Sequence, residues 1–196
     1  MSVTFSATEM LRLVRLHGGL GHQRADCDIE QTDGLSPDTI IAGRLREWYL
    51  GLLDTAPLTM LSPTDVADKA SIAPVSLGES GSAIITAPEN CRRITAVKLS
   101  GWHNTAPVLP HSELDHTARL QENPYTRADE YNPVAVALPD RNRVRIWPSL
   151  SDAVLPQRIQ TLTAVVDPGP EAFTFDESAL AGIIRPDNPF FPTLTL

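Results

Sequence analysis

The spacing of apolar side chains predicts two amphipathic helices early in the chain. Apolar residues recur at three- and four-residue intervals over Met10–Leu16, directly after Ser6–Glu9, which has the pattern of a capping box. A second broad apolar face runs over Ile40–Leu53, behind the helix-start sequence Ser36–Asp38. A polar stretch over residues 20–35 is expected to be a long loop between the two helices.

From residue 83 the pattern changes to short alternating runs, which predict β-strands. Strands are expected over Ala83–Ala87, Arg92–Ser100, a short piece between Pro107 and Pro110, Pro133–Leu138, Arg143–Trp147 and Arg158–Val166. Single turns or short helices are expected over Asp65–Ala70, Ser112–Gln121 and Asp176–Ile184, and a loop over Ser71–Ser82. The clearest pairing is a hairpin, because Pro139–Asn142 supplies a turn between two alternating runs.

Together these elements predict an α+β fold. We expect a single domain over residues 1–184, helical over 5–56 and β-rich over 83–166, followed by an extended arm over 185–196. Three prolines within twelve residues exclude regular structure in that arm, and its apolar side chains favour docking on its own domain or on a neighbouring subunit.

Composition narrows the classes of function. The chain has 196 residues, 42% of them hydrophobic, and no apolar run is long enough for a transmembrane helix. The first residues lack the pattern of a secretory signal, so a reducing compartment is expected. A net charge of −8 argues against a protein that coats DNA. Arginine supplies 14 of the 16 basic residues, which suits protein interfaces but equally suits a GC-rich genome.

Side chains that could carry chemistry are present without the required spacing. Two groups have the residue types of metal ligands: His22, Asp26, Cys27 and Asp28, and then His103, His111, Asp115 and His116. Neither has the paired spacing of a zinc site. Gly18–Gly21 follows a helix rather than a strand, which is the wrong context for a phosphate loop, and Cys91 is interpreted as a buried strand residue. We therefore predict no catalytic residue, metal or cofactor.

The most basic stretch lies on the predicted strands. Arg143 and Arg145 alternate with Val144 and Ile146 and therefore share one strand face, which is either solvated or part of a protein interface. The candidate interface residues on this strand and the arm are Arg143, Arg145, Trp147, Pro189, Phe190, Phe191, Leu194 and Leu196.

Three segments carry a resemblance to a known class of protein. They are Pro-x-x-Cys-Arg-Arg-Ile-Thr-Ala-Val at Pro88–Val97 with Gly101-Trp102, then Asn-Pro-Val-Ala-Val-Ala-Leu-Pro at Asn132–Pro139, then Arg-Val-Arg-Ile-Trp-Pro at Arg143–Pro148. Following amphipathic helices, this order is similar to that in head–tail connector proteins of tailed bacteriophages, also called adaptor, head-completion or neck proteins. The resemblance spans residues 36–166, with Trp147 where many of those proteins have tyrosine; the long polar loop before it departs from their compact helical part.

The resemblance implies a structural protein of the virion, assembled in the cytoplasm of a bacterial host, with no catalytic residues. Such proteins form a ring, commonly of twelve copies, that docks on the portal, extends the DNA channel and offers a surface to the tail or to further neck proteins. An acidic chain suits a channel through which DNA slides without sequence-specific binding. The alternatives are a small β-rich bacterial domain for ligand binding or an accessory role, and, least favoured, a hydrolase using His103, His111 or His116.

Overall fold

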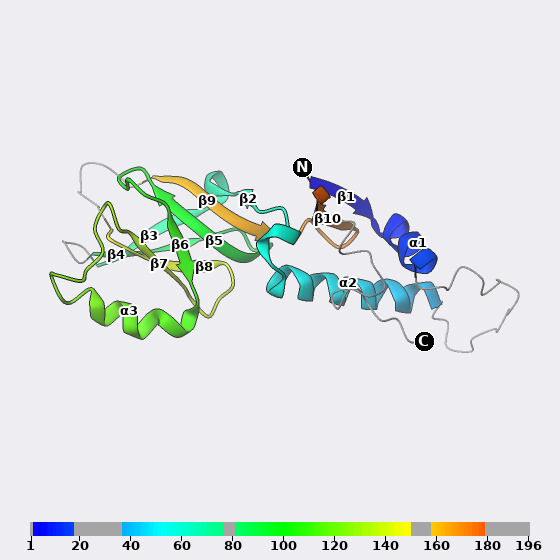
Figure 1. Ribbon diagram of the computed structural model, residues 1–196, viewed down its shortest axis with the longest axis horizontal. Coiled ribbons are helices and arrows are strands. Elements are labelled where there is room, and N and C mark those ends of the chain that lie inside the picture. The colour runs from blue at the N-terminus through cyan, green and yellow to red at the C-terminus, as the bar shows by residue number, and fades with distance from the viewer. Residues whose placement is uncertain (1, 18–36, 77–80, 150–157, 179–196) are drawn as a thin grey trace, which may run out of the picture. The chain divides into compact units, whose positions relative to one another are not determined.

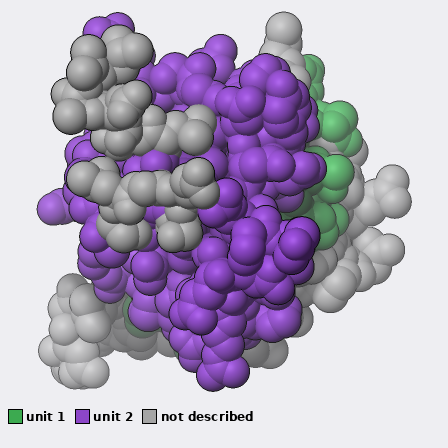
Figure 2. All heavy atoms as spheres, turned by 90° about the vertical axis from the view of Figure 1, so that its left-hand side faces the viewer, with its two compact units in different colours: residues 1–62, 167–196 green, residues 63–166 purple. Residues whose placement is uncertain are grey.

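The chain divides into two compact units, and the single domain expected over residues 1–184 stays a prediction. Its computed structural model describes residues 2–17, 37–76, 81–149 and 158–178. Unit 1 comprises residues 1–62 and 167–196, and unit 2 comprises residues 63–166 (Figures 1 and 2). Unit 2 is therefore an insertion within unit 1, an arrangement that patterns of local periodicity do not reveal.

Unit 1 combines two helices with a two-stranded antiparallel ribbon. Its elements are β1 (Ser2–Ser6), α1 (Ala7–His17), α2 (Pro37–Thr55), a 3-10 turn at Leu58–Met60 and β10 (Ala172–Asp176). Both helices confirm the sequence prediction. The capping box at the start of α1 is present, because the Ser6 N–H donates to Glu9 Oε2 at 2.8 Å and the Glu9 N–H donates to Ser6 Oγ at 3.3 Å. Hydrogen bonds from Ser6 lower the pKa of the Glu9 carboxyl.

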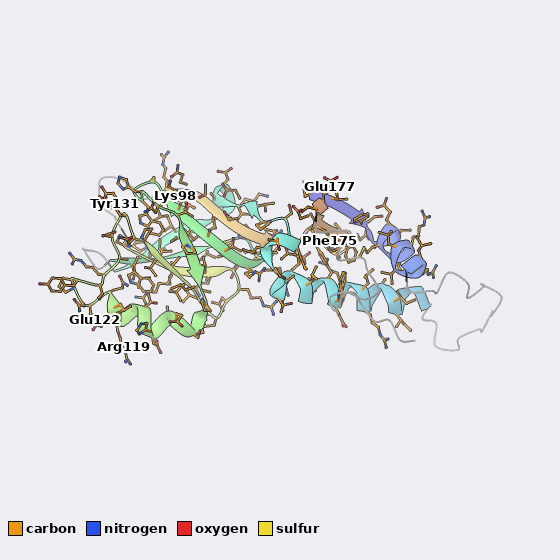
Figure 3. The ribbon with its side chains drawn as sticks, viewed as in Figure 1. Lys98, Arg119, Glu122, Tyr131, Phe175 and Glu177 are labelled. Carbon is orange, nitrogen blue, oxygen red and sulfur yellow. The ribbon has the colours of Figure 1, made fainter. Side chains whose placement is uncertain are left out.

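Aromatic side chains from the ribbon and α2 form the centre of unit 1. Tyr49 is fully buried, with ring centroids 5.0 Å from Phe173 and 5.4 Å from Phe175. Phe175 points from β10 toward α2 (Figure 3). The buried apolar residues of this unit are Met10, Val14, Ile41, Leu45, Leu52, Leu53, Ala56, Leu61, Phe173 and Phe175, together with Tyr49.

Polar contacts link α2 to the segment that returns from unit 2. The Tyr49 hydroxyl accepts a hydrogen bond from the Thr174 N–H at 2.8 Å and donates one to the Thr174 carbonyl oxygen at 3.1 Å. Arg46 Nη2 lies 2.5 Å from each carboxylate oxygen of Asp167, and both side chains are about four-fifths buried. A charged pair with this degree of burial and two short contacts holds its partners more firmly than a surface pair does.

In its described ranges, 63–76, 81–149 and 158–166, unit 2 is an eight-stranded mixed sheet with one helix. Its strands are β2 (Thr64–Asp65), β3 (Ser71–Ser76), β4 (Ser82–Thr86), β5 (Cys91–Leu99), β6 (Ala106–Leu109), β7 (Val134–Ala137), β8 (Arg143–Trp147) and β9 (Ile159–Val166). The strand order is β2-β9-β5-β6-β7-β8-β4-β3, with β6 and β7 parallel and the other neighbours antiparallel. The 3-10 turns Ala67–Lys69 and His111–Glu113 complete the unit, and the second leads into helix α3 (Leu114–Leu120).

The sheet curls so that its two halves share one core. Ile94 and Leu162 on β5 and β9 pack in the same cluster as Ile85 and Ile146 on β4 and β8. Strands β6 and β7 separate these pairs in the sheet, so a flat sheet would hold them too far apart. On the outside of β7 and β8, helix α3 covers a smaller cluster that includes Trp147 (Figure 1). The predicted α+β class is confirmed.

Most predicted strands are present, including the hairpin of β7 and β8, but four strands differ from the prediction. The shortest, β2, begins before the single turn expected over Asp65–Ala70 and includes its first residue. A loop was expected over Ser71–Ser82, yet Ser71–Ser76 forms β3 at the end of the sheet, where the missing N–H of Pro74 is tolerated. Strands β1 and β10 were not predicted. Each is five residues long, and the two pair with each other although most of the chain lies between them in sequence.

Some predictions fall outside the described residues: the loop over residues 20–35, all but the first three residues of the helix expected over Asp176–Ile184, and the arm over residues 185–196. No helix in the described ranges has both the length and the apolar character needed to span a membrane.

Candidate interaction surfaces

The basic face of strand β8 is the first candidate surface. Arg143 and Arg145 are partly exposed, whereas Val144 and Ile146 between them are completely buried, so the two arginines share the predicted face. Arg143 Nη1 donates to Asp140 Oδ2 at 2.8 Å, an exposed pair of the kind that contributes about 0–1 kcal/mol. The Arg145 guanidinium donates to Ser82 Oγ and lies 4.9 Å from the centroid of the Trp147 ring. Arg145 is therefore held against unit 2 both by its hydrogen bonds to Ser82 and by the contact of its guanidinium plane with the Trp147 ring.

Trp147 is a core residue and not part of an open surface. Its side chain is 2% exposed and packs with Val136 and Ala128, with Leu114 and Ala118 of α3 beside them. Alternation along β8 places Trp147 on the same face as the two arginines, but α3 covers that end of the strand. The indole therefore joins the helix to the sheet. The other predicted interface residues, Pro189, Phe190, Phe191, Leu194 and Leu196, lie outside the described residues.

The three histidines of the second candidate group, His103, His111 and His116, are spread over unit 2. His103 stacks on Tyr131 with ring centroids 4.2 Å apart, and His111 Nδ1 lies 3.3 Å from the carbonyl oxygen of Ala137. His116 is exposed on α3. Across the described residues, no three histidine, cysteine or acidic side chains come together in a way that could hold a metal ion. The first group of possible ligands, His22 to Asp28, lies outside those residues.

Cys91 is buried at the start of β5, as predicted, in the main core of unit 2. Burial raises the pKa of its thiol from 9.0 to about 11, because the thiolate would lose its hydration there. Arg92 and Arg93, which follow it in sequence, do not produce a reactive thiolate. Cys91 therefore has a packing role.

This burial predicts slow thiol chemistry. In a Cys27→Ser variant, Cys91 should react with a disulfide reagent at pH 8 about 100-fold or more slowly than the same thiol in denaturant, since two pKa units lower the thiolate fraction by that factor. The measurement is the rate of absorbance change after reagent is added. A rate in the native protein equal to that in denaturant would contradict the buried placement.

Sequence patterns missed a second exposed feature, the loop that follows α3. Tyr125 at its tip is 95% exposed, yet the loop around it is fixed. The Tyr125 N–H donates to Asn123 Oδ1 at 2.9 Å, Thr126 Oγ1 donates to the Leu120 carbonyl, and the Ala128 N–H donates to the buried Gln121 Oε1. The signal in the sequence is the Asn-Pro-Tyr turn, in which a polar side chain can bond to the backbone two residues on.

Comparison of the sequence with models of known protein families and with curated proteins finds no match.

Proposed function

We propose that this chain is a subunit of a bacteriophage head–tail connector ring, which docks on the portal, extends the DNA channel and offers the tail an attachment surface. The observation that carries the proposal is that the segments resembling connector proteins pack together as the framework of unit 2. Pro88–Val97 forms the turn into β5 and most of that strand, Asn132–Pro139 contains β7, and Arg143–Pro148 contains β8.

Two contacts join these segments directly. The Trp102 indole N–H donates to the Pro148 carbonyl oxygen at 3.2 Å, which links the Gly101-Trp102 motif to the end of the third segment. Ile94, Val97 and Ile146 belong to one buried cluster. Likenesses at three separate places in a sequence mean more when those places form one folded unit, because they then describe a shared core.

The charge of the chain also supports the proposal. A net charge of −8 disfavours adhesion of DNA, which suits a wall past which DNA slides. The proposed partners are further copies of this chain, the portal and the tail or other neck proteins. The proposed location is the virion.

The decisive experiment is the mass of the purified protein by light scattering, alone and after mixing with the portal ring of the same phage. A large closed oligomer, or a monomer that assembles only on the portal, is the expected result. A protein that stays monomeric and does not bind the portal would contradict the connector function. Ligand screens would then test the alternative of a β-rich binding domain.

The arm gives a further prediction. Deleting Asp187–Leu196 should leave units 1 and 2 folded but weaken assembly, because the segment combines apolar side chains with prolines at 189 and 192, which are incompatible with a helix. Far-ultraviolet circular dichroism checks the fold, and light scattering checks assembly. Assembly at the same protein concentration with and without the arm would contradict a docking role for it.

A further inference from the structure

The ends of β-sheets expose unpaired backbone groups to which another chain can add a strand. The two sheets formed by the described residues have four end strands: β2 and β3 in unit 2, and β1 and β10 in unit 1. Strand β2 has two residues, which is too short to guide a partner. Strand β3 contains Pro74 and an irregularity in its pairing between Pro74 and Ser76, both of which interrupt a regular edge.

The outer edge of β10 is closed from within unit 1. Tyr49 bonds to both backbone groups of Thr174. The Ala172 N–H donates to the Gly169 carbonyl, and the Ala172 carbonyl accepts from Arg46 Nη1 at 3.4 Å. Because these groups face away from β1, residues 172 and 174 are the non-hydrogen-bonded positions of the ribbon.

The same register fixes the direction of the backbone in β1. Thr4 is opposite Thr174 and Ser2 is opposite Asp176, so Ser2 and Thr4 also occupy non-hydrogen-bonded positions. Their N–H and C=O groups point away from β10, to the outer edge of β1. Within the described part of the chain, those of Thr4 meet no partner, and Thr4 is exposed. The next outward N–H, that of Ser6, is bonded to Glu9.

Strand β1 therefore differs from the other three end strands. Its sequence, Ser-Val-Thr-Phe-Ser, has no charge, no proline and regular alternation, and its pairing with β10 has no irregularity. These are the properties of an edge that accepts an added strand. Proteins that must avoid such pairing place lysine, proline or a bulge there.

We propose that the outer edge of β1 binds residues 193–196 of a second copy of this chain as an added strand. Thr-Leu-Thr-Leu alternates polar and apolar side chains as β1 does, and all four residues have a backbone N–H. The prolines at 186, 189 and 192 precede this segment, so they extend the chain without interrupting the pairing. The choice of a second copy rests on the connector function proposed above, because an arm-to-edge contact is heterologous and can close a ring.

The test follows the Thr4 amide by hydrogen exchange. The host is the full-length chain with Leu194→Asp and Leu196→Asp, which disable its own arm, and the probe is a synthetic peptide of residues 187–196 with the natural sequence. Adding the peptide should slow exchange of the Thr4 amide about 10-fold or more, because that N–H gains an acceptor. A peptide carrying the same two aspartates should have no effect.

Two changes at Thr4 provide matched controls. Thr4→Pro in the host removes the outward N–H without touching the bonds to β10, and should abolish peptide binding. Thr4→Val loses the same contact between the Thr4 and Thr174 hydroxyls, 3.0 Å apart, but keeps the N–H, and should bind. Should Thr4→Pro fail to fold, exchange at the unaltered Thr4 still decides the question.

The outcomes separate this inference from the connector function. Unchanged exchange at Thr4, or equal binding to the Thr4→Pro host, overturns the docking edge even if a ring forms. Protection of Thr4 in a monomer of the intact chain overturns the assignment to a second copy, because the chain's own arm would then fill the edge. Protection by the peptide in a protein that forms no ring supports the edge and contradicts the connector.

Discussion

Replacing Trp147 with alanine is expected to lower the free energy of unfolding of unit 2 by about 3–5 kcal/mol. The indole is 2% exposed and lies between the β7–β8 hairpin and α3, so its removal leaves a cavity that neither element can fill by itself. The loss also takes away the ring under the Arg145 guanidinium. Denaturant titration followed by far-ultraviolet circular dichroism measures the change.

The matched control is Tyr125→Ala. That side chain is also aromatic and lies in unit 2, but at 95% exposure its removal should change the free energy of unfolding by less than about 0.5 kcal/mol. Hydrogen exchange should show faster opening of β7 and β8 in Trp147→Ala. A loss below about 1 kcal/mol in Trp147→Ala would mean that the indole is not buried in the isolated protein.

The second large effect is expected at Tyr49 in unit 1. Tyr49→Ala should cost about 3–5 kcal/mol, because the ring packs against both Phe173 and Phe175. Tyr49→Phe should cost about 1–3 kcal/mol, because it keeps the ring but leaves the N–H and C=O of Thr174 without the hydroxyl. The difference between the two variants separates packing from closure of the β10 edge.

The control for the loss of the hydroxyl is Tyr131→Phe. Because Tyr131 is 52% exposed, removing its hydroxyl should leave the free energy of unfolding nearly unchanged. If Tyr49→Phe were equally neutral, the bonds to Thr174 would contribute no net stability. In that case the edge of β10 would not depend on Tyr49.

Tyr49 also gives unit 1 a dependence on alkaline pH. Burial raises the pKa of its phenol from 10.0 to about 12, so the folded protein retains a proton that the unfolded chain releases. The stabilisation is complete below pH 10 and declines as pH rises through 12. An ultraviolet titration of the native protein minus that of Tyr49→Phe should show this late ionisation. A difference titration centred at pH 10 would contradict the burial.

Local sequence patterns predicted the elements that are specified by residues close together in the chain. Helix α1 was predicted from Ser6 and Glu9, which bond to each other, and the β7–β8 hairpin from a turn between alternating runs. The ribbon of β1 and β10 was missed because its partners are separated by most of the chain. Phe173 and Phe175 alternate with polar residues as a strand requires. The strand was not predicted, because a proline-glycine segment precedes it and a helix was expected to begin at Asp176.

Strand β5 shows a different limit. Its inward residues are Cys91, Ile94, Val97 and Leu99. The first two spacings are three residues instead of two, because β5 has one extra residue relative to β9 between Cys91 and Arg93 and again between Ile94 and Ala96. Each of these two extra residues reverses the faces of β5, so simple alternation predicts the strand but not its buried side.

For the candidate surface, too, the sequence predicted the local features but not those that depend on the folded unit. Alternation correctly placed Arg143 and Arg145 on one face, because this is a property of a single strand. The burial of Trp147 depends on α3, which packs there only in the folded unit. Likewise, which backbone groups of β1 face outward depends on its register with β10, and local sequence patterns do not reveal the register of two strands so far apart in the chain.

The insertion of unit 2 sets the order in which the chain can fold during synthesis. Residues 63–166 are contiguous, and Thr64 pairs with Ala164, so unit 2 can close as soon as its last strand is made. Strand β1 and both helices are made earlier but must wait for β10. At synthesis rates of about 5–20 residues per second, this delay is roughly 5–20 s. During that time β10 is not yet present to cover the apolar side of α2. Helix α2 is therefore made before unit 2 but loses its contact with solvent only after unit 2 is complete.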